Sequence, residues 1–134
     1  MDKALGATNP LDAVNLWLGD ERTVTSLHRD NYENIFCQVI GRKHFVLLPP
    51  TAAPAVNEQW LSGATYQKDM SLAIDDDKTK VPIAIWDPDM PQQNRTPYTH
   101  AWTPLRATLE PGDMLYLPST WYCHASHESV SFLT

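Results

Sequence analysis

Eleven prolines are spread along this chain of 134 residues, and they constrain its fold more than any other feature. A proline inside a helix removes a backbone hydrogen bond and clashes with the preceding turn, so long helices are excluded over much of the chain. The apolar stretches between the prolines are short and are bounded by turns that contain glycine or proline. This pattern is typical of short β-strands. We therefore expect a mainly β protein, either a sandwich or a small barrel.

Six short strands are predicted, at Asn15–Leu18, Thr23–His28, Asn34–Ile40, Lys43–Leu48, Leu105–Leu109 and Met114–Leu117. The tight turn at Gly41-Arg42 predicts that the third and fourth strands form a hairpin. Pro111 and Gly112 provide the turn chemistry between the last two strands. The intervening residues, about 51–104, are expected to form an irregular insertion with one short helix near Val56–Leu61.

The composition is that of one globular domain, with 43% hydrophobic and 19% charged residues. A net charge of −6 argues against a nucleic-acid-binding surface, and it would suit a basic protein or peptide partner as well as plain solubility. Cys37 and Cys123 are too few for a disulfide framework, so we expect a reducing compartment. We see no signal peptide and no apolar run of about 18 residues. These features predict a cytoplasmic protein, with the nucleus as a second location, and no membrane association.

One short motif carries metal-binding chemistry. His28 and Asp30 are two residues apart on a strand-like segment, so their side chains should point to the same side. An imidazole and a carboxylate begin the set of two histidines and one carboxylate that holds non-haem Fe(II) with open positions. Thr25, Asn34 and Lys43 lie close enough in the sequence to converge on the same pocket. A lysine ammonium can pair with a carboxylate, and threonine and asparagine can hydrogen-bond to it.

Three segments together resemble the jumonji-C (JmjC), cupin-like family of Fe(II)/2-oxoglutarate oxygenases, nearest its small lysyl-hydroxylase branch. They are HRDNYEN at residues 28–34, GRKHFVLLPP at 41–50 and EPGDMLYLPSTWY at 110–122. The resemblance covers motif-bearing strands at about 11–50 and 105–122. It implies a double-stranded β-helix, a jelly-roll core with the metal inside its mouth, here incomplete and interrupted by the insertion.

The resemblance also implies a set of ligands. Fe(II) would bind to His28 and Asp30, and 2-oxoglutarate would chelate the iron through its keto-acid end. The far carboxylate of 2-oxoglutarate would lie against Lys43, helped by Thr25, while Asn34 and Phe36 would line the same pocket. The activity implied is O2-dependent hydroxylation of a protein or peptide substrate, with succinate and CO2 as co-products. A homodimer is a further expectation.

The third iron ligand is where the sequence departs from the family pattern Pro-x-x-Trp-aromatic-His. Cys123 stands at the histidine position, and His124 follows it. A shift of one residue along a strand turns a side chain to the opposite face, so His124 reaches the metal only if a bulge re-aims it. Otherwise His124 is the second of an adjacent histidine pair found in some relatives. Cys123 is the alternative ligand, since a thiolate binds borderline metals.

The tail at residues 123–134 diverges from the family, and the family's larger N-terminal portion is missing from the start of the chain. Both features suggest a truncated or mis-spliced sequence, or a decayed paralogue.

Three functions compete for this chain. The first is a 2-oxoglutarate-dependent protein hydroxylase, for which resemblance to the nearest branch implies lysine as the target. The second is a non-catalytic cupin-like binding module, favoured by Cys123. The third is a metal-dependent cupin of another reaction class, such as a peptidase.

Overall fold

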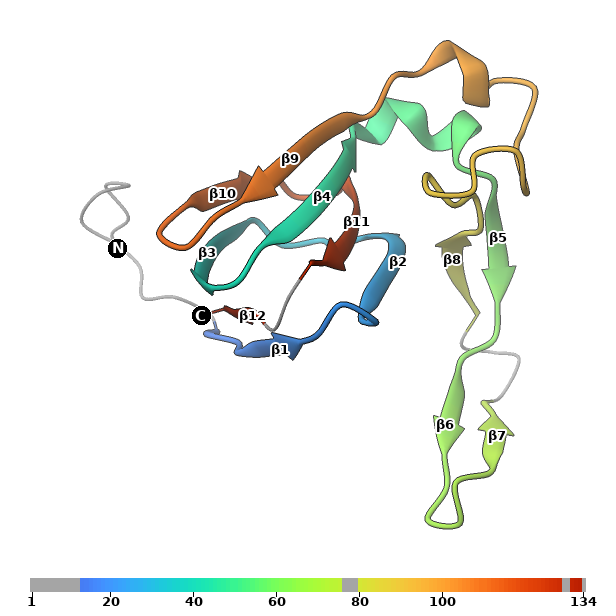
Figure 1. Cartoon of the computed structure of the whole chain (residues 1–134). Helices are drawn as coiled ribbons and strands as arrows, with labels where there is room; N and C mark the ends of the chain where they lie inside the picture. Colours follow the sequence, from blue (N-terminus) through green and yellow to red (C-terminus); the bar gives the residue numbers. More distant parts are fainter. Residues whose placement is uncertain (1–12, 76–79, 129–130, 134) are drawn as a thin grey trace.

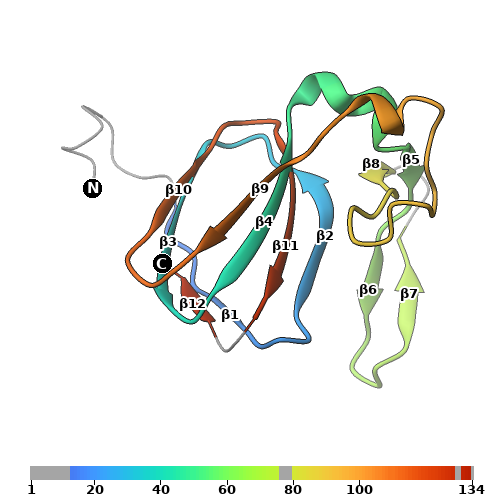
Figure 2. The same ribbon diagram turned by 45° about the horizontal axis from the view of Figure 1, so that its top comes forward.

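The structure is a computed structural model, and it describes residues 13–75, 80–128 and 131–133. Two four-stranded antiparallel sheets face each other and form the body of the molecule (Figures 1 and 2). One sheet has the strand order β1 (Trp17–Gly19), β12 (Ser131–Leu133), β3 (Asn34–Ile40), β10 (Met114–Leu117). The other has the order β2 (Val24–Arg29), β11 (Tyr122–His127), β4 (Lys43–Leu48), β9 (Leu105–Leu109).

The chain changes sheet between successive strands of the body. From β1 to β4, and again from β9 to β12, each strand lies in the sheet opposite to the strand before it. This alternation gives the expected jelly-roll, double-stranded β-helix architecture, and the mainly β fold is confirmed. The predicted bounds of the third to sixth strands are those of β3, β4, β9 and β10.

The predicted hairpin between β3 and β4 is wrong. β3 pairs with β10 and β12, whereas β4 pairs with β9 and β11. Gly41 has a φ of 75°, a conformation that glycine adopts without steric penalty, and it carries the chain across the rim from one sheet to the other. A tight turn is compatible with either arrangement, so the local sequence could not decide between them.

The insertion between β4 and β9 is more regular than expected. It begins with the 3-10 helix η2 (Pro50–Ala55) and continues as two antiparallel pairs, β5 (Glu58–Leu61) with β8 (Val81–Ala84) and β6 (Ala64–Tyr66) with β7 (Leu72–Ile74). A second 3-10 helix, η4 (Thr99–Ala101), precedes β9. The two strand pairs form an arm that projects from the barrel (Figure 1). The short helix predicted near Val56–Leu61 is wrong, because Asn57 has a left-handed φ of 53° and a strand follows it.

Two apolar clusters lie on opposite faces of the sheet that contains β2, β11, β4 and β9. The inner cluster fills the barrel and includes Phe45, Leu47, Leu109, Leu117, Cys123 and Ala125. The outer cluster joins the base of the insertion to the sheet and includes Leu27, Leu48, Ala52, Val56, Ala84, Trp86 and Tyr122. Both faces of this sheet are therefore covered by apolar side chains along β4 and β11.

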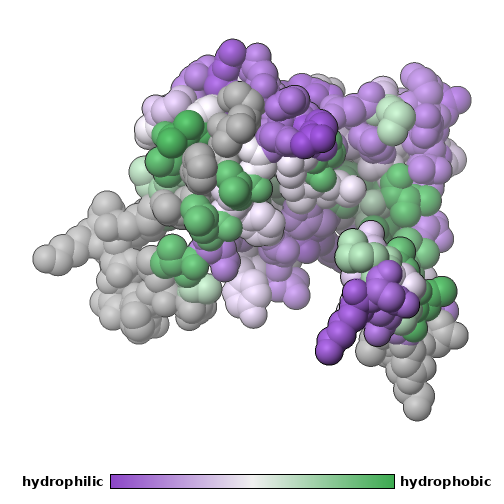
Figure 3. Space-filling model, turned by 60° about the horizontal axis from the view of Figure 1, so that its bottom comes forward, coloured by the Kyte–Doolittle hydropathy of each residue, from purple (hydrophilic) through white to green (hydrophobic). Residues whose placement is uncertain are grey.

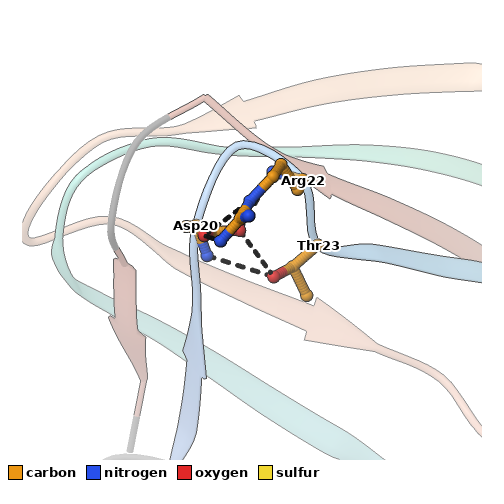
Figure 4. Close-up of polar contacts among 3 residues, drawn as sticks. All are labelled: Asp20, Arg22 and Thr23. Atoms are coloured by element: carbon orange, nitrogen blue, oxygen red, sulfur yellow. Dashed lines mark hydrogen bonds and ion pairs between the residues drawn. The ribbon is translucent and has the colours of Figure 1, made fainter.

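A polar turn joins β1 to β2 and fixes where the motif-bearing strand begins (Figure 4). The Asp20 carboxylate accepts hydrogen bonds from the backbone N–H of Arg22 at 3.0 Å and from its guanidinium at 2.6 Å. The backbone N–H of Asp20 in turn donates to Thr23 Oγ1 at 3.1 Å. The guanidinium of Arg22 lowers the pKa of the Asp20 carboxyl, so the turn keeps its ionised form at neutral pH.

The last residues contribute to both sheets. Residues 123–127, which we placed in a divergent tail, lie in β11 between β2 and β4, and β12 lies between β1 and β3.

The surface combines hydrophilic areas with apolar areas on the barrel and on the arm (Figure 3). On the arm the exposed apolar side chains are Trp60, Leu61, Tyr66, Met70, Leu72, Ile74, Val81 and Ile83. Within the described residues there is no helix long and apolar enough to cross a membrane.

Candidate active site

The register of β2 against β11 places the motif residues on the inner face of the barrel. His28 lies opposite Cys123, and Thr25 lies opposite Ala125. Thr25 and His28 are three positions apart in the sequence, which would put them on opposite faces of a regular strand. An irregularity in the pairing between these two positions has the effect of a β-bulge and brings both onto the face that carries Cys123 and Ala125. Thr25 and His28 therefore share one face of β2 only because the pairing with β11 is irregular between them.

The local hydrogen bonding of His28 leaves one ring nitrogen available for a metal. Its Nδ1 lies 2.8 Å from the carbonyl oxygen of Ser26, which can only accept, so Nδ1 carries the proton. Nε2 then has a free lone pair, and it lies 3.7 Å from Asp30 Oδ2. A carbonyl that fixes the tautomer of a histidine in this way is typical of metal-binding histidines. Both side chains are partly exposed, at 36% and 54%, which places them at the mouth of the barrel.

Lys43 lies deeper in the barrel and is 2% exposed. Its Nζ is surrounded by aromatic rings, at 4.7 Å from the ring centroid of Phe36, 5.4 Å from Phe45 and 5.9 Å from Trp17. Among the described residues no carboxylate forms an ion pair with this ammonium. Burial lowers the pKa of Lys43. The Cys123 thiol and His127 also lie near this ammonium. A buried cation without a carboxylate partner is costly, and an anionic ligand would lower that cost.

The rows of the inner face set the distance between this cation and the metal-ligand pair. His28 and Cys123 form one row, Thr25, Ala125 and Phe45 the next, and His127 and Lys43 a third. Successive rows are two residues apart, roughly 7 Å along a strand. The long lysine side chain shortens the remaining gap, and its Nζ contacts Phe45 in the middle row. The candidate metal ligands and the ammonium therefore lie two rows apart on one interior face.

Asn34 and Phe36 belong to the facing sheet and point into the same interior. Asn34 lies opposite the buried Leu117, and Phe36 lies opposite Leu115. Phe36 packs edge-on against Phe45, with ring centroids 5.0 Å apart. The amide Nδ2 of Asn34 donates a weak hydrogen bond to the Tyr32 carbonyl at 3.3 Å. The structure thus brings Thr25, His28, Asn34, Phe36 and Lys43 to one interior.

The structure does not bring His124 to His28 and Asp30. Cys123 faces inward opposite His28, and His124, one residue further, points to the outer face, where its Nε2 lies 3.0 Å from Asp89 Oδ2. The pairing irregularity re-aims residues of β2 and leaves the alternation of β11 intact. In the described part of the chain, the one group of three or more potential ligands whose atoms lie within 4.8 Å of one another is Asp87, Asp89 and His124. His28, Asp30 and Cys123 form a more open arrangement.

Sequence reasoning missed Glu58, which supports both strands of the candidate site from outside. Its carboxylate lies 3.1 Å from Arg29 Nε and accepts a hydrogen bond from the Tyr122 hydroxyl at 2.8 Å. Arg29 stands between His28 and Asp30, and Tyr122 precedes Cys123. Burial and the hydrogen bond to Glu58 raise the pKa of the Tyr122 hydroxyl, so it stays a donor. No sequence motif marks Glu58, because its partners are distant in the chain.

The Cys123 thiol should react slowly with alkylating reagents in the metal-free protein. It is 4% exposed, and burial raises the pKa of its thiol to about 12 despite the nearby charge of Lys43. Only the thiolate is alkylated, and its fraction falls tenfold for each unit by which the pKa rises. We expect iodoacetamide at neutral to mildly alkaline pH to label Cys37, which is half-buried, at least about 10-fold faster than the enclosed Cys123. Peptide mapping of native and urea-unfolded samples measures this; equal labelling of both thiols in the native protein would show that Cys123 is not enclosed.

Comparison with known proteins identifies the family of this chain. The family model described as "Cupin-like domain" matches residues 1–133. A human protein named bifunctional peptidase and (3S)-lysyl hydroxylase JMJD7 is 42% identical over 117 residues, which cover 84% of this chain and 37% of that protein. Lysine-specific demethylase JMJ32 of Arabidopsis thaliana is 35% identical, with 86% and 37% covered. JmjC domain-containing protein E of Dictyostelium discoideum is 32% identical, with 89% and 38% covered.

The chain therefore belongs to the JmjC, cupin-like family. This is the family of Fe(II)/2-oxoglutarate oxygenases that the motifs at residues 28–34, 41–50 and 110–122 resemble, and the relatives named above include a lysyl hydroxylase. The chain spans between 37% and 38% of the length of these three relatives.

Proposed function

We propose that this chain is an Fe(II)- and 2-oxoglutarate-dependent protein hydroxylase that acts on a lysine side chain. The observation that carries the proposal is the enclosed ammonium of Lys43, which faces the interior that also holds His28 and lacks a carboxylate partner among the described residues. A cation kept in this state at the expense of stability is most simply explained by an anionic cosubstrate. The similarity to a named lysyl hydroxylase supports lysine as the target.

Different residues of the inner face would bind the metal and 2-oxoglutarate. His28 and Asp30 would hold the metal, with Cys123 in the third position, and Lys43 would neutralise the far carboxylate of 2-oxoglutarate. The Thr25 hydroxyl would hydrogen-bond to that carboxylate, while Asn34 and Phe36 would line its path. Bound Fe(II) and 2-oxoglutarate supply O2-dependent hydroxylation of a C–H bond, with succinate and CO2 as co-products. The apolar walls formed by Phe36, Phe45 and Leu117 would exclude water from this pocket.

A second function is favoured by Cys123. A thiol in the third ligand position, with a pKa raised by burial, is a weaker iron ligand than an imidazole at neutral pH. The competing proposal is a cupin-like binding module that takes up 2-oxoglutarate without turning it over. The two functions differ in one measurable product, because only the hydroxylase forms succinate.

Replacing Asp30 by alanine tests the hydroxylase directly. Asp30 would provide the only carboxylate of the metal set, so its removal should lower Fe(II)-dependent succinate formation at least 100-fold, on the order of 3 kcal/mol of transition-state stabilisation. The assay measures succinate with and without lysine-containing peptides, and Asp69→Ala on the exposed arm is the control. Succinate formation that survives Asp30→Ala unchanged would contradict the proposal. Binding of 2-oxoglutarate to the unaltered protein without any succinate would favour the binding module.

A further inference from the structure

His124 takes part in a separate polar cluster on the outer face of the barrel. Its side chain is only 3% exposed, and its Nε2 lies 3.0 Å from Asp89 Oδ2. Asp89 comes from the insertion, just after Trp86, which is anchored in the outer apolar cluster. Two segments far apart in the sequence, β11 and the segment after β8, thus meet at this histidine.

Asp87 completes the cluster. One of its oxygens, Oδ1, accepts a hydrogen bond from the backbone N–H of Asp89 at 2.8 Å, which curls the Asp87-Pro88-Asp89 segment around its carboxylates. The potential ligand atoms of Asp87, Asp89 and His124 all lie within 4.8 Å of one another. Tetrahedral ligands at about 2.0 Å from Zn²⁺ are roughly 3.3 Å apart. Movements of the Asp87 and Asp89 carboxylates would have to shorten these separations by up to about 1.5 Å to close the set around an ion.

Two further observations concern the surroundings of this cluster. His124 Nδ1, the ring nitrogen that does not face Asp89, is buried and has no hydrogen-bond partner among the described residues, and such atoms in folded proteins generally contact a water or an ion. A cavity of about 320 Å³ lies beside the cluster and has both His124 and Asp87 in its lining, together with the polar side chains of Ser26, Gln93 and Asn94. This volume holds several water molecules, which could hydrogen-bond to the second ring nitrogen and fill open metal positions.

We propose that Asp87, Asp89 and His124 form a second metal site, for a divalent ion of the Zn²⁺ type, separate from the site at the barrel mouth. One imidazole and two carboxylates are ligands that suit Zn²⁺, with water in the fourth position. The bound ion would join the insertion to β11 at the residue next to Cys123. This proposal does not depend on the hydroxylase function, because it uses no residue of the inner face.

Arg106 is the one competing cation near the cluster among the described ion pairs. Its Nη1 lies 3.8 Å from Asp89 Oδ1, and both side chains are well exposed, at 59% and 50%. Exposed ion pairs of this length contribute about 0–1 kcal/mol, so a divalent ion between two carboxylates would displace this contact readily. Arg106 also donates to the Pro88 carbonyl at 3.3 Å and can keep that bond when the ion is present.

Titration with Co²⁺ as a spectroscopic substitute for Zn²⁺ tests the proposal. In the unaltered protein we expect a Co²⁺ equivalent with visible bands of a nitrogen and oxygen ligand set and no thiolate charge-transfer band. The variant Asp87→Asn/Asp89→Asn should lose this equivalent, and the single variant Asp87→Asn should bind Zn²⁺ at least about 10-fold more weakly. Both aspartates are outside the buried core, so we expect these variants to fold, and circular dichroism verifies it.

Two further variants distinguish metal binding at this site from a general effect of charge and from metal binding at the barrel mouth. Asp69→Asn/Asp75→Asn makes the same change in charge on the exposed arm and should keep the equivalent. Cys123→Ser combined with Asp30→Ala should remove metal binding at the barrel mouth only, so its result reports on the proposed function and not on this site. The second site is refuted if the folded Asp87→Asn/Asp89→Asn variant binds as much Co²⁺, with the same bands and affinity, as the unaltered protein.

Discussion

Replacing Lys43 by methionine should make the ligand-free protein more stable and abolish its binding of 2-oxoglutarate. Methionine fills nearly the same volume without a charge, and the aromatic rings of Phe36, Phe45 and Trp17 can pack against it. Removing a buried cation that no carboxylate of the described residues pairs with should raise the free energy of unfolding by on the order of 1 kcal/mol or more. Loss of a buried charge partner should weaken 2-oxoglutarate binding by about 2–5 kcal/mol, which is roughly 30- to 5,000-fold.

The same substitution should change how stability depends on pH. Burial lowers the pKa of Lys43 in the folded state, so between that value and the unfolded value near 10.4 the unfolded chain binds more protons. Stability gains a positive contribution as pH rises through this window. In Lys43→Met that contribution should be absent.

Urea unfolding over a pH series and calorimetric titration with 2-oxoglutarate measure these effects. Lys68→Met, which removes an exposed lysine from the arm, is the control and should change neither quantity by much. A Lys43→Met protein that is less stable and binds 2-oxoglutarate as well as before would mean that Lys43 is a structural residue.

Replacing Cys123 by histidine should turn a weak iron site into a strong one. Cys123 lies opposite His28 on the inner face, so an imidazole there would complete two histidines and one carboxylate. We expect Fe(II) to bind at least about 10-fold more tightly and succinate formation to rise with it. The larger side chain displaces apolar neighbours of the inner cluster and should lower stability by about 1–3 kcal/mol.

Fe(II) binding by equilibrium dialysis and succinate formation measure this change. Cys37→His provides the matched control, because Cys37 lies in β3 of the opposite sheet and faces away from the row of His28. If folded Cys123→His protein binds Fe(II) no more tightly than the unaltered protein, then position 123 is not a ligand position.

The barrel strands could be predicted from the sequence because their patterns are local, whereas the roles of the site residues came from the family resemblance and stay a prediction. Short apolar runs between glycine and proline turns mark β3, β4, β9 and β10, and the spacing of His28 and Asp30 indicates their shared side. The path of the chain between the sheets was not predictable in this way. A turn such as Gly41-Arg42 looks the same whether it joins paired strands or crosses from one sheet to the other.

The choice between Cys123 and His124 also depended on long-range information. Both residues lie in β11, and the register against β2 and β4 decides which one faces His28. The cluster of Asp87, Asp89 and His124 brings together residues 35 positions apart in the chain, so no spacing rule could reveal it. The contact of Glu58 with Tyr122 could not be predicted for the same reason, because the two residues are 64 positions apart.

Anaerobic optical titration with Fe(II) and 2-oxoglutarate tests the central claim most directly, because the iron chelate of this keto acid has a metal-to-ligand charge-transfer band. The unaltered protein should develop the band in proportion to added Fe(II), and Asp30→Ala and Lys43→Met should not. Its absence from folded, unaltered protein at saturating concentrations of both ligands would contradict the assignment of His28, Asp30 and Lys43 to an Fe(II)/2-oxoglutarate site.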